Sequence, residues 1–289
     1  MANAAILPNH MKLGLRPARL ALDDLIWPMG QPSELRGGQL GDLSREDHLI
    51  CFPRSTLHMR PSFGTRAQVS IMVLEPGAIH ARHLTRLRSS YRRFHRVLTA
   101  NRTLLDAIPN GIFFPFGGTW VENWRDLKIE KSQMCSLIAS AKRSETGHVL
   151  RHEMADWIAT EGHAIDVMGG GYAPFKRKSD GLAPYRYSLV IENVQEPNYF
   201  TEKLVDAILC QCVPIYWGCP NIANFIDPAA MIITNSIQEM QDAVRNMSKA
   251  DYAARLPTLL SQQEKAAHWG DVYTRAAWAV LDPASGQMP

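Results

Sequence analysis

The sequence predicts an α/β fold with two units, each an open sheet of buried strands that alternate with helices. Two short apolar runs, residues 48–52 (HLICF) and 68–74 (QVSIMVL), are rich in Val and Ile and are bounded by Pro53 and Pro76, which is typical of buried strands. A helical pattern comes next, and beyond residue 120 the alternation of strand and helix patterns begins again. This repetition indicates a second α/β unit.

The first unit contains these two strands, one helix and one further strand. The helix is predicted from an apolar set at helical intervals: Leu84, Leu87, Tyr91 and Phe94. Residues 96–99 then have a strand-like pattern. Elsewhere the first sixty residues are poorly periodic and rich in turn formers, and no other element is predicted there.

Residues 109–120 (PNGIFFPFGGTW) combine Pro, Gly and aromatic residues so densely that no regular element is predicted in them. We place the linker between two domains there or just after it, which gives predicted domains of residues 1–122 and 123–289. In the second domain, strands are predicted at residues 135–140, 163–168, 185–192 and 213–217, and helices at 148–160, 201–211 and across 237–281.

Composition and charge are those of an ordinary globular protein. Of 289 residues, 46% are hydrophobic and 20% are charged, and a formal net charge of +3 is too small to indicate nucleic-acid binding. Five cysteines are an odd number without CxxC spacing, so we expect buried free thiols. No apolar run reaches the roughly 18 residues of a membrane span and no signal-peptide pattern begins the chain, so a cytoplasmic location is expected.

Residues 185–217 have the pattern of a right-handed βαβ unit, in which ligands bind at the carboxyl ends of the strands. Thr201 is a good N-cap, and the backbone N–H groups that follow it suit an anion. Lys203 opposes the helix dipole, which is explained if it meets an anion, and Glu202 can accept hydrogen bonds from hydroxyl groups. The spacing alone fits a pair of ordinary surface charges equally well.

The run IENVQEPNYFTEKLVDAILCQCVPIYWG (residues 191–218) resembles the C-terminal signature of the α-1,3/4-fucosyltransferase family. That signature has a Phe-Glu-Asn start, a Tyr-x-Thr-Glu-Lys segment where a helix begins, and a Val-Pro-(Ile/Val)-Tyr-Trp-Gly strand. Here Ile191 replaces the Phe, and Val194 stands where Ser or Thr is common. Weaker similarity extends upstream through SLIAS (residues 136–140), GHVLRH (147–152) and residues 166–171.

The resemblance implies a GT-B fold, in which two Rossmann-like domains face each other across a cleft and the C-terminal domain holds GDP-fucose. It places five residues at donor-binding positions: Arg151, Asn193, Tyr199, Glu202 and Lys203. Arg151 and Lys203 would stabilise the negative charge that grows on the diphosphate as the glycosidic bond breaks. Two such cations make a divalent metal unnecessary, so we expect no cofactor and metal-independent turnover.

An inverting transfer also needs a base that takes the proton of the acceptor hydroxyl. The resemblance implies Glu75, because the family has a Glu with this role after the corresponding N-terminal strand. Here Pro76 follows the Glu, and the surrounding residues match the family poorly. The alternative is that Glu75 is a strand-end residue that caps the following helix; Asp24 and Asp47 have no support as bases.

Residues 81–96 (ARHLTRLRSSYRRFHR) carry six basic residues around the apolar helical stripe: Arg82, Arg86, Arg88, Arg92, Arg93 and Arg96. Such a helix can contact anionic lipid or an acidic glycan, or it can be a solvated face. We favour peripheral contact of Arg82 to Arg96 with the inner membrane surface. The pairs His148/His152 and His80/His83 have spacings that a metal can use, but the pattern suggests no third ligand, and we predict no metal site.

Taken together, the pattern and the resemblance predict an inverting glycosyltransferase that moves fucose, or a related sugar, from GDP to a hydroxyl of a glycan acceptor. One alternative is a glycosyltransferase that uses a different nucleotide sugar, because residues 1–122 are short and diverged. The other is a catalytically silent protein of the same fold that binds a nucleotide or a glycan.

Overall fold

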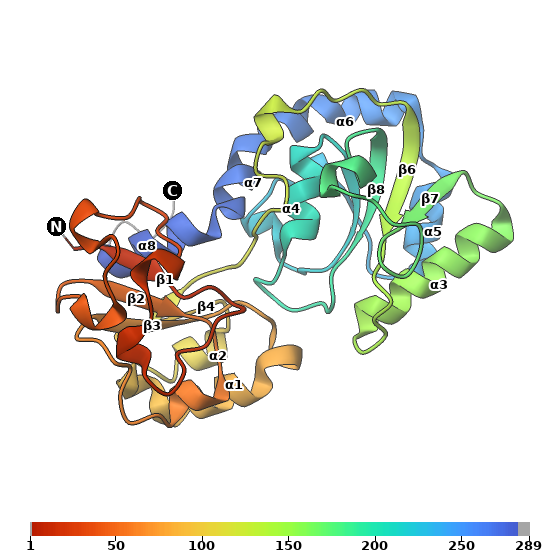
Figure 1. Cartoon of the computed structure of the whole chain (residues 1–289). Helices are drawn as coiled ribbons and strands as arrows, with labels where there is room; N and C mark the ends of the chain where they lie inside the picture. The colour runs from red at the N-terminus through yellow and green to blue at the C-terminus, as the bar shows by residue number, and fades with distance from the viewer. Residues whose placement is uncertain (1, 283–289) are drawn as a thin grey trace. The chain divides into compact units, whose positions relative to one another are not determined.

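A computed structural model describes residues 2–282 as parts of two compact units (Figure 1). Unit 1 contains the chain up to Pro115 together with the segment from Val272 onward, and unit 2 contains Phe116–Asp271. Helix α8 (Val272–Leu281) packs against the first two strands of unit 1 through its small apolar face. The chain therefore returns to unit 1 at its C-terminal end, whereas the predicted division kept every C-terminal helix in the second domain.

Unit 1 contains a sheet of five parallel strands in sequence order. Three of the strands end within one residue of the predicted bounds, which confirms the buried apolar runs. The strands are β1 (Ala4–Ile6), β2 (His48–Cys51), β3 (Gln68–Val73), β4 (Val97–Thr99) and β5 (Gly111–Phe113).

The prediction that residues 109–120 contain no regular element is wrong at β5. Pro109 and Pro115 flank the three residues of this strand and do not interrupt them, so its backbone groups remain free to pair with β4. β5 lies at one end of the sheet and the unpredicted β1 at the other. The Pro and Gly residues around β5 hide the pattern from which strands are predicted.

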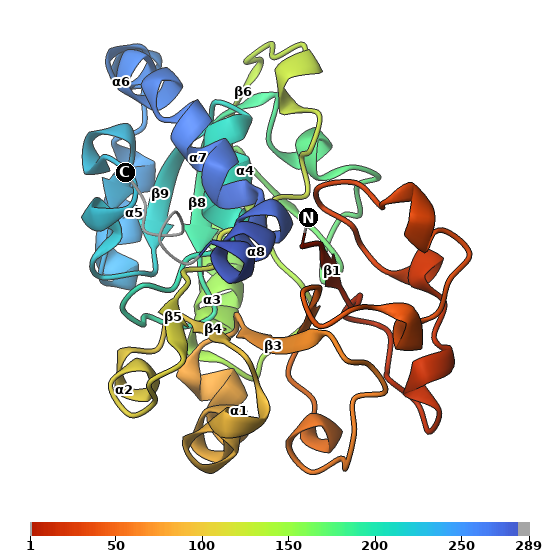
Figure 2. The ribbon, with the colours of Figure 1, turned by 90° about the vertical axis from the view of Figure 1, so that its left-hand side faces the viewer.

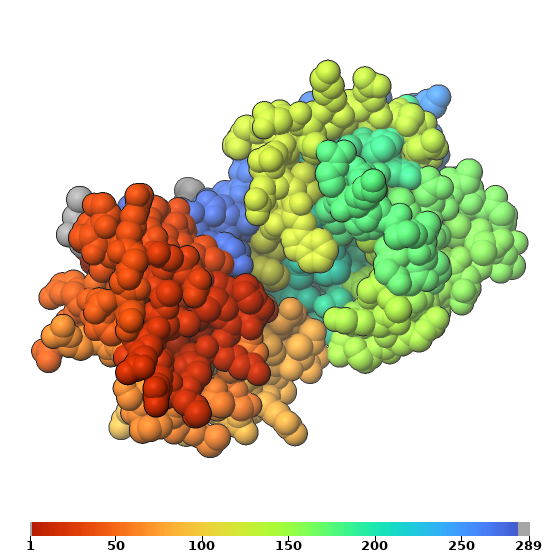
Figure 3. Space-filling view, in the orientation of Figure 1, coloured from red at the N-terminus to blue at the C-terminus, as the bar shows by residue number. Residues whose placement is uncertain are grey.

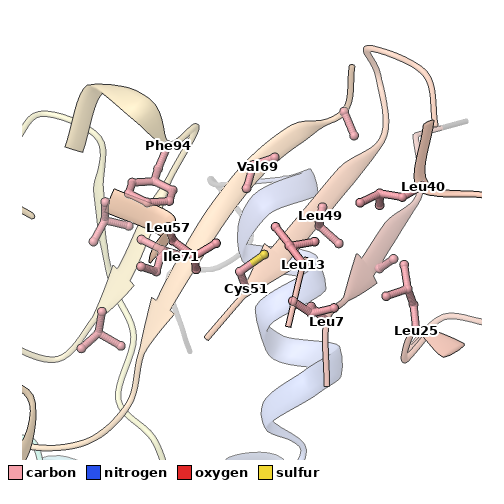
Figure 4. Packing of buried hydrophobic residues seen from close by; sticks show 14 of the residues in the cluster. Leu7, Leu13, Leu25, Leu40, Leu49, Cys51, Leu57, Val69, Ile71 and Phe94 are labelled. Atoms are coloured by element: carbon pink, nitrogen blue, oxygen red, sulfur yellow. The ribbon is translucent and has the colours of Figure 1, made fainter. Parts of the chain in front are cut away.

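Apolar side chains from β2 and β3 form the centre of the unit 1 core (Figure 4). Leu49, Cys51, Val69 and Ile71 all lie in this buried cluster. The predicted helix is present as α1 (Gly77–Ser90), and a 3-10 turn at Tyr91–Arg93 delivers the buried Phe94 to the same core. A single helical turn, α2 (Arg102–Leu105), connects β4 to β5.

Unit 2 contains a second parallel sheet, with strand order β10-β9-β8-β6-β7. The chain runs from β6 to β7 on one side and then returns to place β8 on the other side of β6. In open α/β sheets, ligands bind at such a reversal, outside the carboxyl ends of the strands. The strands are β6 (Gln133–Ile138), β7 (Ile165–Met168), β8 (Tyr185–Ile191), β9 (Val213–Trp217) and β10 (Ile232–Ile233).

Two helices begin at this reversal, because α3 (Thr146–Glu161) follows β6 and α4 (Glu202–Leu209) follows β8. Helix α4 lies beside α7 (Gln263–Gly270), as Figures 1 and 2 both show. Trp269 of α7 is fully buried, and its ring packs edge-on against Phe200 at 5.4 Å between ring centres. Because Phe200 precedes the cap of α4, this contact fixes where the helix begins.

The remaining helices of unit 2 are α5 (Ile237–Arg245) and α6 (Lys249–Ser261), which confirms the helical pattern predicted across residues 237–281. All five cysteines are buried free thiols, as the sequence predicts: Cys51, Cys135, Cys210, Cys212 and Cys219. None of the helices in the described part of the chain has both the length and the hydropathy needed to span a membrane.

Candidate donor site

The five residues predicted to bind the donor lie together in unit 2, at the carboxyl ends of β6 and β8. Arg151 comes from α3, Asn193 and Tyr199 from the loop after β8, and Glu202 and Lys203 from the first turn of α4. In Figure 3 the surface of unit 2 is hollowed where the teal β8–α4 region reaches it, and the green segment that precedes β8 stands beside this hollow. The residues predicted to form the donor site are therefore close together in the structure.

A fully buried carboxylate, Glu192, holds the loop between β8 and α4 in place. The backbone N–H of Thr201 donates to Glu192 Oε1 at 2.8 Å, and the Thr201 hydroxyl donates to Oε2, also at 2.8 Å. Lys203 Nζ lies 3.5 Å from the same Oε2. A buried carboxylate requires such partners, since its desolvation would otherwise be very costly.

The start of α4 places Lys203 at the edge of this network. Thr201 is the N-cap, as predicted, and its Oγ1 accepts hydrogen bonds from Lys203 N at 3.3 Å and from Lys203 Nζ at 3.0 Å. Burial opposes the charge on Lys203, but Glu192 and Glu202 outweigh it and raise the pKa of the ammonium. The Lys203 side chain is still 22% exposed and Glu202 is 15% exposed, so both are accessible to a ligand.

Arg151 is buried beneath the same loop. Its Nε donates to the carbonyl oxygen of Ile191 at 2.9 Å, and its Nη2 donates to Asn193 Oδ1 at 2.9 Å. Burial lowers the pKa of this guanidinium, while Glu192, Tyr199 and Glu202 act in the opposite direction. Arg151 therefore both orients the loop and adds a second positive charge beside Lys203.

A pair of amides fixes the far side of the loop. Asn198 has a left-handed backbone with φ of 65°, which Asn tolerates better than most residues. Its backbone N–H donates to Asn221 Oδ1, and Asn221 Nδ2 donates to Asn198 Oδ1, both at 2.8 Å. Next to this pair, the buried Tyr199 brings its hydroxyl to within 3.5 Å of Asn193 Nδ2. Asn193 is thus held from two sides and remains half-exposed.

Helix α3 approaches the loop so closely that only glycine fits at position 147. The backbone N–H of Gly147 donates to the carbonyl oxygen of Asn193 at 2.9 Å. A Cβ built on Gly147 would lie 1.7 Å from the carbonyl oxygen of Glu192, well inside any real contact distance. The GHVLRH segment therefore matters for its backbone as well as for Arg151.

Two further charged groups lie beside the predicted cluster, and the sequence pattern did not single them out. Asp206 of α4 is fully buried, and its Oδ1 accepts hydrogen bonds from Thr119 Oγ1 at 2.6 Å and Trp120 N at 3.0 Å. Burial raises the pKa of Asp206 to about 7. Lys178, in a 3-10 turn that precedes β8, interacts electrostatically with Asp206 and with Glu202. Irregular turns have no periodic sequence pattern, so periodicity could not have identified Lys178 as part of the site.

The candidate base, Glu75, lies in unit 1, where it is half-buried in the turn between β3 and α1. The sequence suggested that Glu75 stands at the end of the strand. The strand ends at Val73, so Glu75 lies two residues beyond it. Pro76 occupies the N-cap position of α1, and that helix begins at Gly77. This position is that of a loop residue at the carboxyl edge of the sheet.

Three of the four histidines weighed as metal ligands, His83, His148 and His152, have other hydrogen-bond partners. His83 Nδ1 lies 3.0 Å from Nε2 of His58, and burial, followed by the neighbouring His83, lowers the pKa of His58 and His80 to about 4. His152 contacts the Tyr172 hydroxyl at 2.7 Å. Within residues 2–282, no group of three His, Cys, Asp or Glu side chains is arranged to hold a metal ion.

The basic set of residues 82–96 extends past α1 and is less uniform than its spacing suggests. Arg86 and Arg96 are half-buried. The exposed members are Arg82, Arg88, Arg92 and Arg93. The continuous basic face predicted from Arg82 to Arg96 is therefore reduced to these four residues.

Comparison with solved structures confirms the predicted GT-B-like fold. An alpha1,3-fucosyltransferase solved with GDP is similar with a TM-score of 0.51 at 16% identity, covering 82% of this chain and 78% of that one. TarM is similar with a TM-score of 0.52 at 11% identity, covering 83% of this chain and 55% of that one. At these identities the similarity concerns the fold alone.

The relationship to the fucosyltransferase family is confirmed by sequence comparison. Residues 125–255 match the family model "Glycosyltransferase family 10 (fucosyltransferase) C-term". This match includes the whole predicted donor cluster and Lys178. The predicted resemblance to the fucosyltransferase family is therefore confirmed over this segment, which is less than half of the chain.

Individual relatives agree with this family. An alpha-(1,3)-fucosyltransferase of Helicobacter pylori is 33% identical over 69 residues, which are 24% of this chain and 14% of that protein. A 3-galactosyl-N-acetylglucosaminide 4-alpha-L-fucosyltransferase of Bos taurus is 26% identical over 195 residues, 62% of this chain and 52% of that protein. Apart from the short Helicobacter match, the alignments span about half the length of these relatives.

Replacing Gly147 by Ala tests how closely α3 must approach the donor loop. The added methyl group collides with backbone that cannot move without shifting Glu192, so we expect a loss of roughly 1–3 kcal/mol in stability. Thermal unfolding followed by circular dichroism measures it. Gly170→Ala is the control, because a Cβ there meets nothing within 4 Å. Equal melting temperatures for the two variants would contradict the close approach.

Proposed function

We propose that this chain is an inverting glycosyltransferase that transfers fucose from GDP-fucose to a hydroxyl group of a glycan. The observation that supports this most strongly is the joint placement of Arg151 and Lys203 around the loop after β8. Both cations lie at the strand-order reversal, and both are oriented by backbone or side-chain oxygens. Such an arrangement suits the diphosphate of a nucleotide sugar.

In the proposed reaction, an acceptor oxygen forms a bond to the anomeric carbon of the sugar. The bond from that carbon to the diphosphate breaks, and its electron pair leaves with GDP. Lys203 and Arg151 stabilise the charge that develops on the leaving group. We propose that these cations replace a divalent metal, so that turnover is metal-independent.

The polar groups beside the cations fit the rest of the donor. Glu202 can accept hydrogen bonds from hydroxyl groups of a sugar or ribose, and the amide of Asn193 can both donate and accept. Glu75 is proposed to accept the proton of the attacking hydroxyl, on the basis of its position after β3 and the family resemblance. The sugar, the acceptor and the inversion are parts of this proposal.

We also propose that the protein acts at the cytoplasmic surface of a membrane, with the four exposed arginines of the α1 region toward anionic lipid. Cosedimentation with anionic phospholipid vesicles, weakened in an Arg88→Ser, Arg92→Ser double variant, would support this location. Equal cosedimentation with neutral vesicles would argue against it.

Replacing Lys203 by Ala is expected to weaken GDP binding by roughly ten-fold to a hundred-fold, since a charge-assisted contact contributes about 1.5–3 kcal/mol. Calorimetric titration with GDP and with guanosine measures this. Lys203 also neutralises buried Glu192, so the variant will lose some stability. If the variant has lost only a specific phosphate contact, its affinity falls for GDP and not for guanosine. If the loop is distorted, the affinity for guanosine falls as well. Unchanged GDP affinity would contradict the phosphate role.

Replacing Glu75 by Gln is expected to lower the rate of fucose transfer from GDP-fucose by roughly 10² to 10⁴ and to leave GDP affinity unchanged. Transfer is measured by chromatography of glycan products from an acceptor panel, with Glu34→Gln as a control at an exposed glutamate. Full transfer by Glu75→Gln would contradict its role as the base. Transfer from another nucleotide sugar would favour a glycosyltransferase with a different donor. GDP binding without any transfer would favour a catalytically silent binding protein.

A further inference from the structure

Lys178 occupies an unusual position for a lysine. It begins a 3-10 turn, Lys178–Gly181, in the connection between β7 and β8, and it is half-buried. Its ammonium group has neither a hydrogen bond nor an ion pair to any other residue of the described chain. What it does have is an aromatic neighbour, because Nζ lies 5.5 Å from the centre of the Trp120 ring.

The backbone of Trp120 is held by Asp206, a buried carboxylate with one unsatisfied oxygen. The backbone N–H of Trp120 donates to Asp206 Oδ1, and Thr119 Oγ1 donates to the same oxygen. The other oxygen, Oδ2, is buried without a hydrogen-bond partner among the described residues. Trp120 thus contacts Lys178 through its ring and Asp206 through its backbone N–H. A buried oxygen without a partner, such as Asp206 Oδ2, calls for an explanation.

Lys178 also interacts electrostatically with residues of the donor cluster. Burial lowers the pKa of the Lys178 ammonium, Asp206 and Glu202 partly oppose this, and Lys203 and Arg151 add to it. The last two effects are repulsions, since three positive groups lie near one another. Oxygens of the protein anchor Arg151 and Lys203, whereas Lys178 has no such oxygen among the described residues.

We propose that Lys178 is a third cation of the donor site, which contacts the diphosphate of the nucleotide sugar and is supported by Trp120 and Asp206. This inference rests on the proposed function and adds a residue to it. A doubly charged anion removes the repulsion among the three cations and supplies the partner that Lys178 lacks. A neutral hydroxyl would satisfy the hydrogen bond but would leave the charge uncompensated.

The competing explanation is that the aliphatic stem of Lys178 simply covers the Trp120 ring while its charge faces solvent. The two explanations differ in what the charge contributes. Lys178→Met keeps an apolar stem and removes the charge, and Lys178→Arg keeps the charge. Lys176→Met removes an exposed positive charge two residues away and serves as the matched control.

The experiment is calorimetric titration of the wild type and the three variants with GDP and with guanosine. We expect Lys178→Met to bind GDP about ten-fold or more weakly and to bind guanosine as the wild type does. Lys178→Arg should retain most of the GDP affinity, and Lys176→Met should retain all of it. Lys178→Met should change the melting temperature little, because the charge that it removes forms no hydrogen bond or ion pair among the described residues, and the Met side chain can still cover the Trp120 ring.

The outcomes separate this inference from the function on which it rests. If the wild type binds GDP and Lys178→Met binds it equally well, the role of Lys178 is overturned and the proposed function stands. Parallel losses of GDP and guanosine affinity in Lys178→Met would also overturn it, because the residue would then support the loop as a whole. If the wild type binds no GDP, both are overturned.

Discussion

The donor-side geometry depends on one buried carboxylate. Glu192 emerges at the end of β8 with no exposed surface, and its two oxygens are satisfied by the backbone and hydroxyl of Thr201. The only cation within ion-pair distance of it, among the described residues, is Lys203. The carboxylate therefore fixes where α4 begins and holds Lys203 at the edge of the site, because an unpaired buried charge would be too costly to keep.

The second cation depends on the same few residues from the opposite side. Arg151 bonds the carbonyl oxygen of Ile191, the residue just before Glu192, and the side chain of Asn193, the residue just after it. Gly147 lets α3 come close enough for these bonds. Two helices that start at neighbouring strands thus converge on three consecutive residues. A displacement of that tripeptide would move both cations together, which explains why so much hydrogen bonding is concentrated there.

The sequence predicts the strands and helices well where apolar runs are long, and the donor cluster well where a dense motif carries the resemblance. It fails where the structure is set by distant contacts. Strands β1 and β5 are only three residues long, and they exist because a neighbouring strand offers them backbone partners. Lys178 lies in an irregular turn, so its place beside Asp206 and Trp120 arises only after the chain returns to form β8. Glu192 was visible within the motif, but its structural importance depends on burial, which spacing does not reveal.

We propose that unit 2 holds a guanosine diphosphate through cations that belong to the protein. Calorimetric titration of the purified chain with GDP, UDP, CDP and ADP, first in a chelating buffer and then with magnesium, tests it most directly. We expect GDP alone to bind tightly, with the same affinity in both buffers. Selective binding of another nucleotide, binding of none, or binding of GDP only with magnesium would contradict it.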